Sequence, residues 1–146
     1  MNMSLNSSKP LLYEDAYLCM FYDEETNCIV KQWKQSVSEN KFKELIIQLL
    51  IKIVNTRLQL RKNINLIADC RKMGEETFTN EVIDWLNQHV HKVYAMNKIT
   101  KKAFIAPDTI SSDGQLASYI SSARLEGNFS MKLFTDIEMA KSWLKN

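Results

Sequence analysis

Short apolar runs alternate along this chain with longer segments in which apolar residues recur every three or four positions. Runs of strand length bounded by turn-forming residues predict β-strands, whereas the longer spacing predicts amphipathic helices. The segments follow the order β-β-α-β-α-β-α-β-α. This order predicts a single α/β domain with a mixed, mostly parallel five-stranded sheet flanked by helices. The expected strands are residues 17–22, 28–33, 64–69, 103–106 and 131–134.

Turn and capping signals divide the chain between these elements. Residues 23–27 are rich in Asp, Glu and Asn, which favour a turn, so the first two strands should form a hairpin. Right-handed crossovers would make the later strands parallel and place helices on both faces. We expect residues 1–14 to be a flexible N-terminal leader and 15–146 to be the domain. The expected helix starts are Ser36 (with Glu39 completing a capping box), Thr79, Ser112 or Asp113, and Thr135 (with Glu138).

The first expected helix carries more apolar residues than one buried face requires. Burying five of them would contribute about 8–15 kcal/mol before the entropy cost, so packing against the sheet decides this helix. The residues at regular helical spacing are Phe42, Leu45, Ile46, Leu49 and Ile53, and the additional apolar positions are Ile47, Leu50 and Val54.

Residues 66–68, within the expected strand 64–69, are apolar without interruption, which is typical of a central strand that is buried on both faces. Ligands of open α/β sheets bind outside the carboxyl ends of such strands, so any site is expected in the loop that follows. Two interpretations are open: Asp69 and Arg71 orient a ligand, or Asp69 caps the loop and Arg71 pairs with a neighbouring acid. The candidate binding residues of this loop and edge are Asp69, Cys70, Arg71, Lys72, Ser112 and Asp113.

Composition and charge exclude several classes of partner. The formal net charge of +2 provides no strong field. Basic residues near Arg61 precede the central strand and Arg71 follows it, so they should lie at opposite ends of the sheet and form no nucleic-acid patch. The most apolar run, residues 45–54, is half the length of a bilayer span, so we expect no membrane span and a cytoplasmic location.

Catalytic and metal chemistry finds little support in the sequence. Three cysteines, Cys19, Cys28 and Cys70, form an odd set without metal-type spacing, and buried reduced thiols are expected. Cys70 would need a base as well as a nearby cation to act as a nucleophile. The two histidines, His89 and His91, lie at the far end of the second helix and are too closely spaced to share a helix face. We therefore expect no catalytic residue, metal or cofactor.

The chain resembles the STAS-like group of small bacterial proteins, whose fold is related to CRAL-TRIO lipid-binding domains. The resemblance lies in residues 29–33, 66–71, 134–136 and 140–144. It implies a regulatory module of the anti-sigma-factor-antagonist type. Antagonists of this group carry an Asp-Ser-Ser-Gly-like phosphorylation loop after the central strand. The corresponding loop here has no serine or threonine before Thr77, so phosphorylation at the usual serine of the group is not expected.

The sequence leaves three functional hypotheses open. The first is a non-enzymatic binding or regulatory module that acts through protein contacts. The second, which the CRAL-TRIO kinship implies, is a carrier of a small apolar or amphipathic ligand held among aromatic and methionine side chains. The third is an enzyme using Asp69, Cys70 and Arg71. The sequence leaves the oligomeric state open. The aromatic and methionine residues in question are Tyr13, Tyr17, Phe21, Tyr22, Trp33, Met73, Met96, Met131 and Met139.

Overall fold

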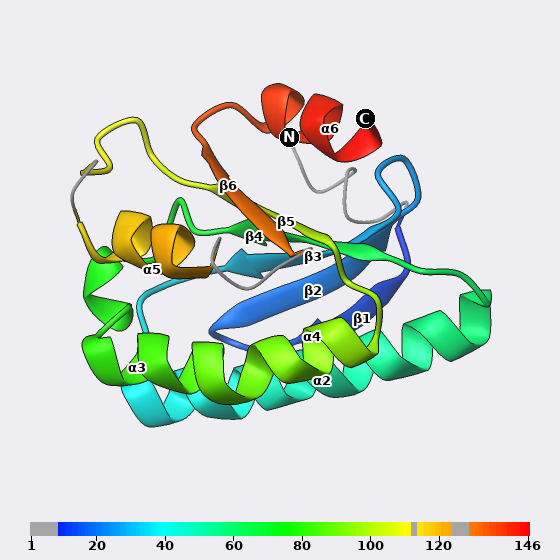
Figure 1. Cartoon of the computed structure of the whole chain (residues 1–146), viewed down its shortest axis with the longest axis horizontal. Coiled ribbons are helices and arrows are strands. Elements are labelled where there is room, and N and C mark those ends of the chain that lie inside the picture. Colours follow the sequence, from blue (N-terminus) through cyan, green and yellow to red (C-terminus); the bar gives the residue numbers. More distant parts are fainter. Residues whose placement is uncertain (1–8, 112–113, 124–128) are drawn as a thin grey trace.

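The computed structural model describes residues 9–111, 114–123 and 129–146, and it contains one six-stranded sheet. The strands follow one another across the sheet in chain order (Figure 1). The β1–β2 and β2–β3 pairs are antiparallel, and β3, β4, β5 and β6 are parallel. The strands are β1 (Leu11–Glu14), β2 (Leu18–Asp23), β3 (Cys28–Trp33), β4 (Asn65–Asp69), β5 (Lys101–Ile105) and β6 (Ser130–Phe134).

The strand β1 corrects the prediction of five strands and of a flexible leader that extends to residue 14. This four-residue strand pairs with β2 at the edge of the sheet. The Asp15 carboxylate accepts hydrogen bonds from the backbone N–H groups of Tyr17 and Leu18, which fixes the turn into β2. An edge strand this short is formed by its pairing, because its own sequence buries little.

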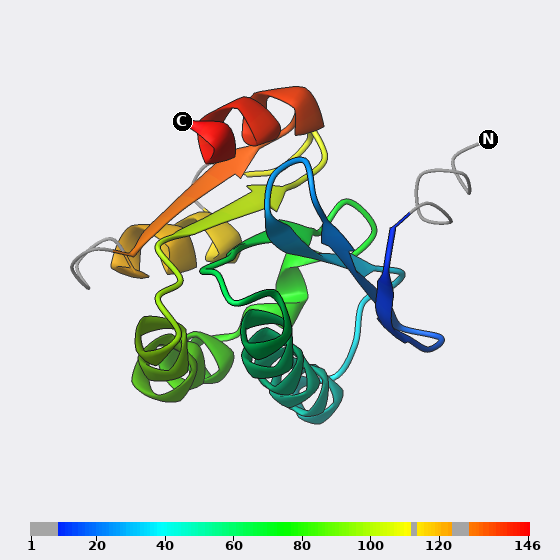
Figure 2. The same ribbon diagram turned by 90° about the vertical axis from the view of Figure 1, so that its right-hand side faces the viewer.

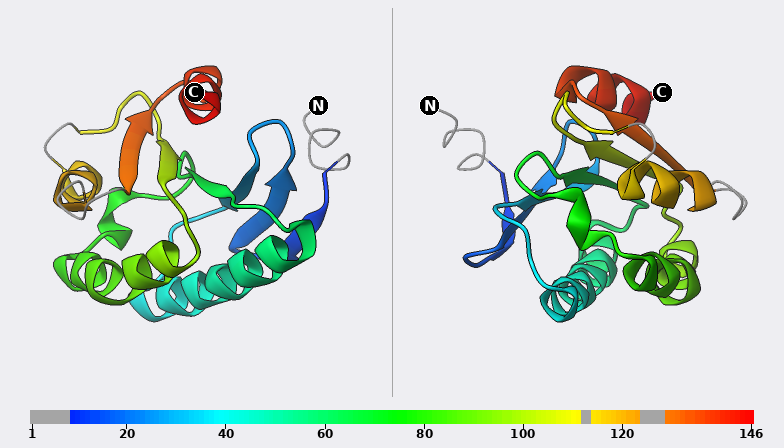
Figure 3. Two further views of the ribbon diagram at one scale, coloured as in Figure 1. Left: turned by 45° about the vertical axis from the view of Figure 1, so that its right-hand side comes forward. Right: turned by 90° about the vertical axis from the view of Figure 1, so that its left-hand side faces the viewer.

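Helices cover the two faces of the sheet unequally (Figures 1 and 2). The long helix α2, the segment α3–η2–α4 and helix α5 pack on one face, whereas α6 lies on the other (Figure 3). The segment α3–η2–α4 is continuous and contains a π-helical turn. The bounds are α2 (Glu39–Leu60), η1 (Glu75–Thr77), α3 (Asn80–Trp85), η2 (Leu86–Val90), α4 (His91–Met96), α5 (Gln115–Ala123) and α6 (Ile137–Lys145).

Alternation along the strands divides the core into two clusters. Leu66 and Ala68 of β4 face the larger cluster, beneath α2 and α3, whereas Ile67 faces the smaller one, beneath α6. All three are at most 1% exposed, so β4 is the buried central strand that its apolar run predicts. Two ion pairs also hold α6 over the sheet, because Lys141 and Lys145 both reach the Glu25 carboxylate in the β2–β3 turn, at 3.2 and 3.0 Å.

The strand order changes where a ligand crevice is expected. In a doubly wound sheet the crevice opens where neighbouring connections leave toward opposite faces. The connections through α2, through α3–η2–α4 and through α5 all cross the same face here. Among the described elements, the divergence comes after β5 and β6, since α5 and α6 lie on opposite faces. Helices do cover both faces as predicted, but the loop after β4 does not lie at a switch point.

Helix starts fall within two residues of the predicted positions. The N-cap of α2 is Ser38, whose hydroxyl accepts from the Lys41 N–H, and Thr79 caps α3 as predicted. The Ser36 hydroxyl instead accepts a hydrogen bond from the Gly74 N–H, at 2.8 Å. Ser36 thus ties the loop before α2 to the loop after β4. The predicted caps Ser112 and Asp113 lie outside the described residues.

Within the described ranges, none of the helices combines the length and the apolar character that crossing a bilayer requires.

Candidate functional site

The loop after β4, predicted to carry the site, closes on itself. The Arg71 guanidinium donates two hydrogen bonds to the Asp69 carboxylate, at 2.9 and 2.7 Å. The same carboxylate accepts from the Arg71 backbone N–H at 3.2 Å. Asp69 is 8% exposed, whereas the Arg71 side chain is half exposed. The carboxylate is therefore occupied by its own loop, and the acid with which Arg71 pairs is Asp69 itself.

Cys70 lies next to this ion pair but points into the core. Its side chain is 2% exposed and belongs to the larger cluster, on the face opposite to that of Ile67. Burial raises the pKa of the Cys70 thiol to about 12, which outweighs the opposite effect of nearby lysines. A thiol that stays protonated is a weak nucleophile. The geometry thus disfavours the enzymatic hypothesis built on Cys70.

Three predicted residues remain, Lys72, Ser112 and Asp113. Lys72 is exposed, and Ser112 and Asp113 lie outside the described residues. The loop is linked to the rest of this edge by two other contacts, the Ser36–Gly74 hydrogen bond and a 3.3 Å bond from the Leu116 N–H to the Glu75 carboxylate. These contacts join the loop before α2, the segment after β4 and the first turn of α5 at the carboxyl edge of the sheet, and they have a structural role.

The cysteines are buried in the core, and the aromatic residues of the hairpin lie on both faces of the sheet. Cys19, Cys28 and Cys70 are all free and buried, as predicted. Phe21 faces the smaller cluster and Trp33 the larger one, so the aromatic residues of the hairpin do not line one cavity. In the described part of the chain, no group of three His, Cys, Asp or Glu side chains is close enough to hold a metal ion.

Two buried lysines form the least expected feature of the molecule. Lys31 of β3 and Lys102 of β5 are each 2% exposed, and they lie close enough across β4 for each to affect the pKa of the other. The small side chain of Ala68, which is paired with Lys31 in the sheet, leaves room for them. The Lys102 ammonium also donates to the Tyr94 hydroxyl at 3.3 Å. No carboxylate is among these contacts, so none of them supplies a negative charge to balance the two lysines.

Burial controls the titration of both lysines. It lowers the pKa of Lys31 from 10.5 to about 8. The pKa of Lys102 is lowered well below its ordinary value, by burial first and by the neighbouring Lys31 second. The aromatic rings around Lys102 compensate in part, since its ammonium lies 4.8 Å from the ring centre of Phe104 and 5.4 Å from that of Tyr94.

An aromatic network surrounds the pair and includes the only histidine of the core. The His91 Nε2 atom lies 2.7 Å from the Tyr119 hydroxyl, and its ring packs against Tyr94 and Phe129. Burial, followed by the charge of Lys102, lowers the pKa of His91 to about 4. His91 is thus a neutral core residue at ordinary pH.

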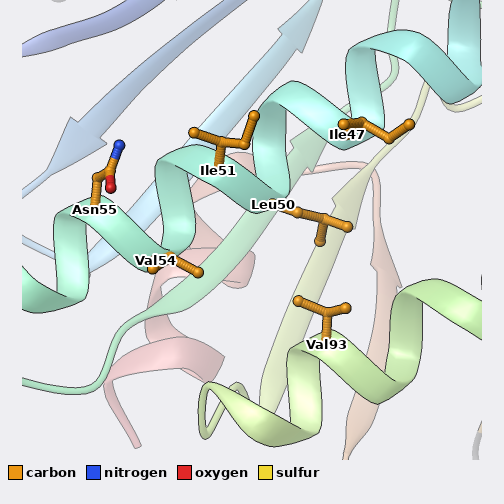
Figure 4. Close-up of a pocket in the computed structure, with 6 residues that line it drawn as sticks. All are labelled: Ile47, Leu50, Ile51, Val54, Asn55 and Val93. Carbon is orange, nitrogen blue, oxygen red and sulfur yellow. The ribbon is translucent and has the colours of Figure 1, made fainter.

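A third feature lies on the outer surface of α2. Four residues on one line of this helix, Ile47, Ile51, Val54 and Leu58, are 49%, 46%, 38% and 72% exposed. We call these four residues the apolar stripe. Beside them runs an open groove of about 320 Å³ between α2 and α4, where Leu50 and Val93 point toward each other (Figure 4). The residues that line the groove are Ile47, Leu50, Ile51, Val54, Asn55 and Val93.

Sequence reasoning missed the lysines and noted only part of the stripe. Lys31 lies between Ile29 and Trp33 at inward positions of the same strand, so the alternation pointed to an inward lysine. The signal for the stripe was the excess of apolar residues on the first helix, since a helix that is apolar beyond one face has a second surface to cover.

Comparison with protein-family models, curated proteins and solved structures gives no significant match for this chain.

Proposed function

We propose that this protein is a non-enzymatic binding module that acts through protein contacts, and that α2 provides the contact surface. The observation that carries the proposal is the apolar stripe, which exposes four large side chains in one line along a well-formed helix. Contiguous exposed apolar surface on a water-soluble fold is typical of a protein interaction site.

The distribution of charge around the stripe supports this function. Between Leu45 and Thr56 the helix carries a single charged residue, Lys52, whereas charged residues lie toward both ends, among them Glu44 and Arg61. An apolar centre with few charges and a polar rim is the usual composition of a protein interface. The loop after β4 contributes less to the proposal, because Asp69 and Arg71 satisfy each other.

The STAS-like resemblance remains a prediction, and the regulatory role it implies is part of the proposal. The carrier hypothesis would use the groove beside the stripe. With a volume of about 320 Å³, the groove is at the lower limit of ligand pockets and is open along α2. An open apolar groove fits a side chain or helix of a partner better than a detached lipid.

A photo-crosslinking residue at position 51 tests the proposal in the native cell. We expect crosslinked protein adducts from position 51, and their loss when Leu58→Glu is added, because a carboxylate on the stripe has to be desolvated on binding. Position 139 is the matched control, since Met139 is 62% exposed on α6, which covers the other face of the sheet. Leu58→Glu should change the free energy of unfolding by less than about 0.5 kcal/mol, because Leu58 is exposed.

Two outcomes would contradict the proposal. Equal adducts from positions 51 and 139 would show that α2 provides no specific surface. A lipid retained in native mass spectrometry and displaced by Leu58→Glu, without protein adducts, would establish the carrier function in its place.

A further inference from the structure

We infer that the partner of the apolar stripe is a second copy of this chain, packed with its α2 antiparallel to the first. This inference rests on the proposed function and names the partner of the same surface. It follows from the spacing of the stripe, from its symmetry and from the charges at its two ends.

The spacing of the stripe is that of a helix–helix interface. Ile47, Ile51, Val54 and Leu58 are separated by four, three and four residues, which is the repeat of the buried positions in a two-helix coiled coil. The buried face of α2, with Leu45, Leu49 and Ile53, packs on the sheet, so the stripe is a second and separate line on the same helix. A second helix packed along this line would bury its apolar side chains.

The order of residues along the stripe is self-complementary. A twofold axis between residues 52 and 53 places Ile51 opposite Val54 of the second copy, and Ile47 opposite its Leu58. Each contact then occurs twice, as in the twofold interfaces of most homodimers. Both layers pair one large aliphatic side chain with another, so the alignment leaves no polar residue in the centre.

Charge complementarity at the ends selects the antiparallel direction. The same axis places Glu44 opposite Arg61 of the second copy, the left-handed residue that ends α2, and this pairing also occurs twice. Lys43 falls opposite Lys62, but Lys43 is already paired with Glu39 at 3.1 Å. The Glu44 side chain is 64% exposed and makes a 3.4 Å ion pair with Lys41, a contact that contributes little and can be exchanged. Antiparallel helices also bring opposite ends of their dipoles together. In a parallel pair Glu44 would meet Glu44 and Arg61 would meet Arg61.

Charge exchange and sedimentation test the inference on the full chain. We expect sedimentation to show a dimer at high micromolar protein concentration that dissociates into monomers on dilution to low micromolar concentration. Glu44→Arg should weaken it about tenfold, because each ion pair becomes a repulsion, and Arg61→Glu should act alike. The double variant with both changes should restore the wild-type dissociation constant. Restoration by the double variant cannot arise from misfolding of the single ones, and thermal unfolding of all three checks the fold.

Cysteine crosslinking tests the direction of the helices independently. The native cysteines are free and buried, so introduced thiols on α2 are the reactive ones. Ile47→Cys together with Leu58→Cys should give a covalent dimer on mild oxidation, whereas either change alone should not. Positions 47 and 58 are about 16 Å apart along the helix, too far to be joined within one chain or between two copies of the same position.

The outcomes separate this inference from the proposed function. A monomer at all concentrations would overturn the inference, and so would efficient crosslinking by the single cysteine variants, which indicates parallel helices. If the protein is monomeric while position 51 still crosslinks to a different protein in a Leu58-dependent manner, the proposed function stands and the second copy is excluded as its partner.

Discussion

Replacing Lys31 by methionine is expected to raise the free energy of unfolding by about 3 kcal/mol near neutral pH. Methionine has nearly the same length and fills the same space, but it carries no charge that the core must desolvate. The drop in the pKa of Lys31 from 10.5 to about 8 measures the cost of its charged form in the folded protein. The change also removes a positive neighbour from Lys102, whose pKa is lowered by Lys31.

The pH dependence of this gain follows from the sign of the pKa shift. Below pH 8 Lys31 is protonated in both the folded and the unfolded state, and folding carries the full cost. As the pH rises from 8 to 10.5 the folded protein releases the proton first, so the cost declines. The advantage of Lys31→Met should therefore be smaller at about pH 9 than at neutral pH. Lys31 lowers the pKa of the Cys70 thiol, so its removal raises that pKa further, and the folded thiol stays protonated at pH 9 in both proteins.

Urea unfolding of the wild type and of Lys31→Met at the two pH values measures both effects. Lys132→Met is the matched control, because Lys132 is also a strand lysine but is exposed on β6, and its change should stay within about 0.5 kcal/mol. A loss of stability in Lys31→Met would contradict the prediction. It would indicate that the folded protein supplies the ammonium with a partner of opposite charge.

These lysines also show where sequence reasoning was insufficient. The central strand was predictable, because a short apolar run such as residues 66–68, followed by a polar loop, fits few other places in a fold. The inward direction of Lys31 was visible in the strand alternation, yet the general rule that lysine is exposed contradicts it. Only the packed structure shows that Ala68 leaves the space and that Phe104 and Tyr94 provide the rings that make the burial tolerable.

The candidate site was predictable in part. One of the two open interpretations had Asp69 as a cap and Arg71 paired with a neighbouring acid, and the structure identifies that acid as Asp69. The ligand crevice was expected after β4 because the strands were assumed to follow the order of a doubly wound sheet. The order depends on which strands pair with each other, and short-range sequence patterns do not encode this pairing. The stripe on α2 was visible as excess apolar positions, but its exposure depends on how the helix is rotated against the sheet.

His91 provides the second large prediction, which concerns stability in acid. Burial lowers the pKa of His91 from 6.5 to about 4, so between these values the unfolded chain binds a proton that the folded protein does not. The contribution of neutral His91 to the free energy of unfolding is therefore fully present above pH 6.5, and it is lost as the pH decreases toward 4. The expected loss over this range from His91 is about 3 kcal/mol.

The variant His91→Phe separates the charge of the imidazole from its packing. Phenylalanine retains a ring against Tyr94 and Phe129 but leaves the Tyr119 hydroxyl without its 2.7 Å partner, which should cost about 1–3 kcal/mol at neutral pH. Between pH 6.5 and 4 its stability should then fall less than that of the wild type, so the two unfolding curves converge in acid. Carboxylates with a lowered pKa, such as Asp23, also reduce the stability in acid. They reduce it equally in the wild type and in His91→Phe, so they do not make the two curves converge. Parallel curves over this range would contradict the prediction. They would show that His91 binds a proton as readily in the folded protein as in the unfolded chain, so that its burial does not keep it neutral.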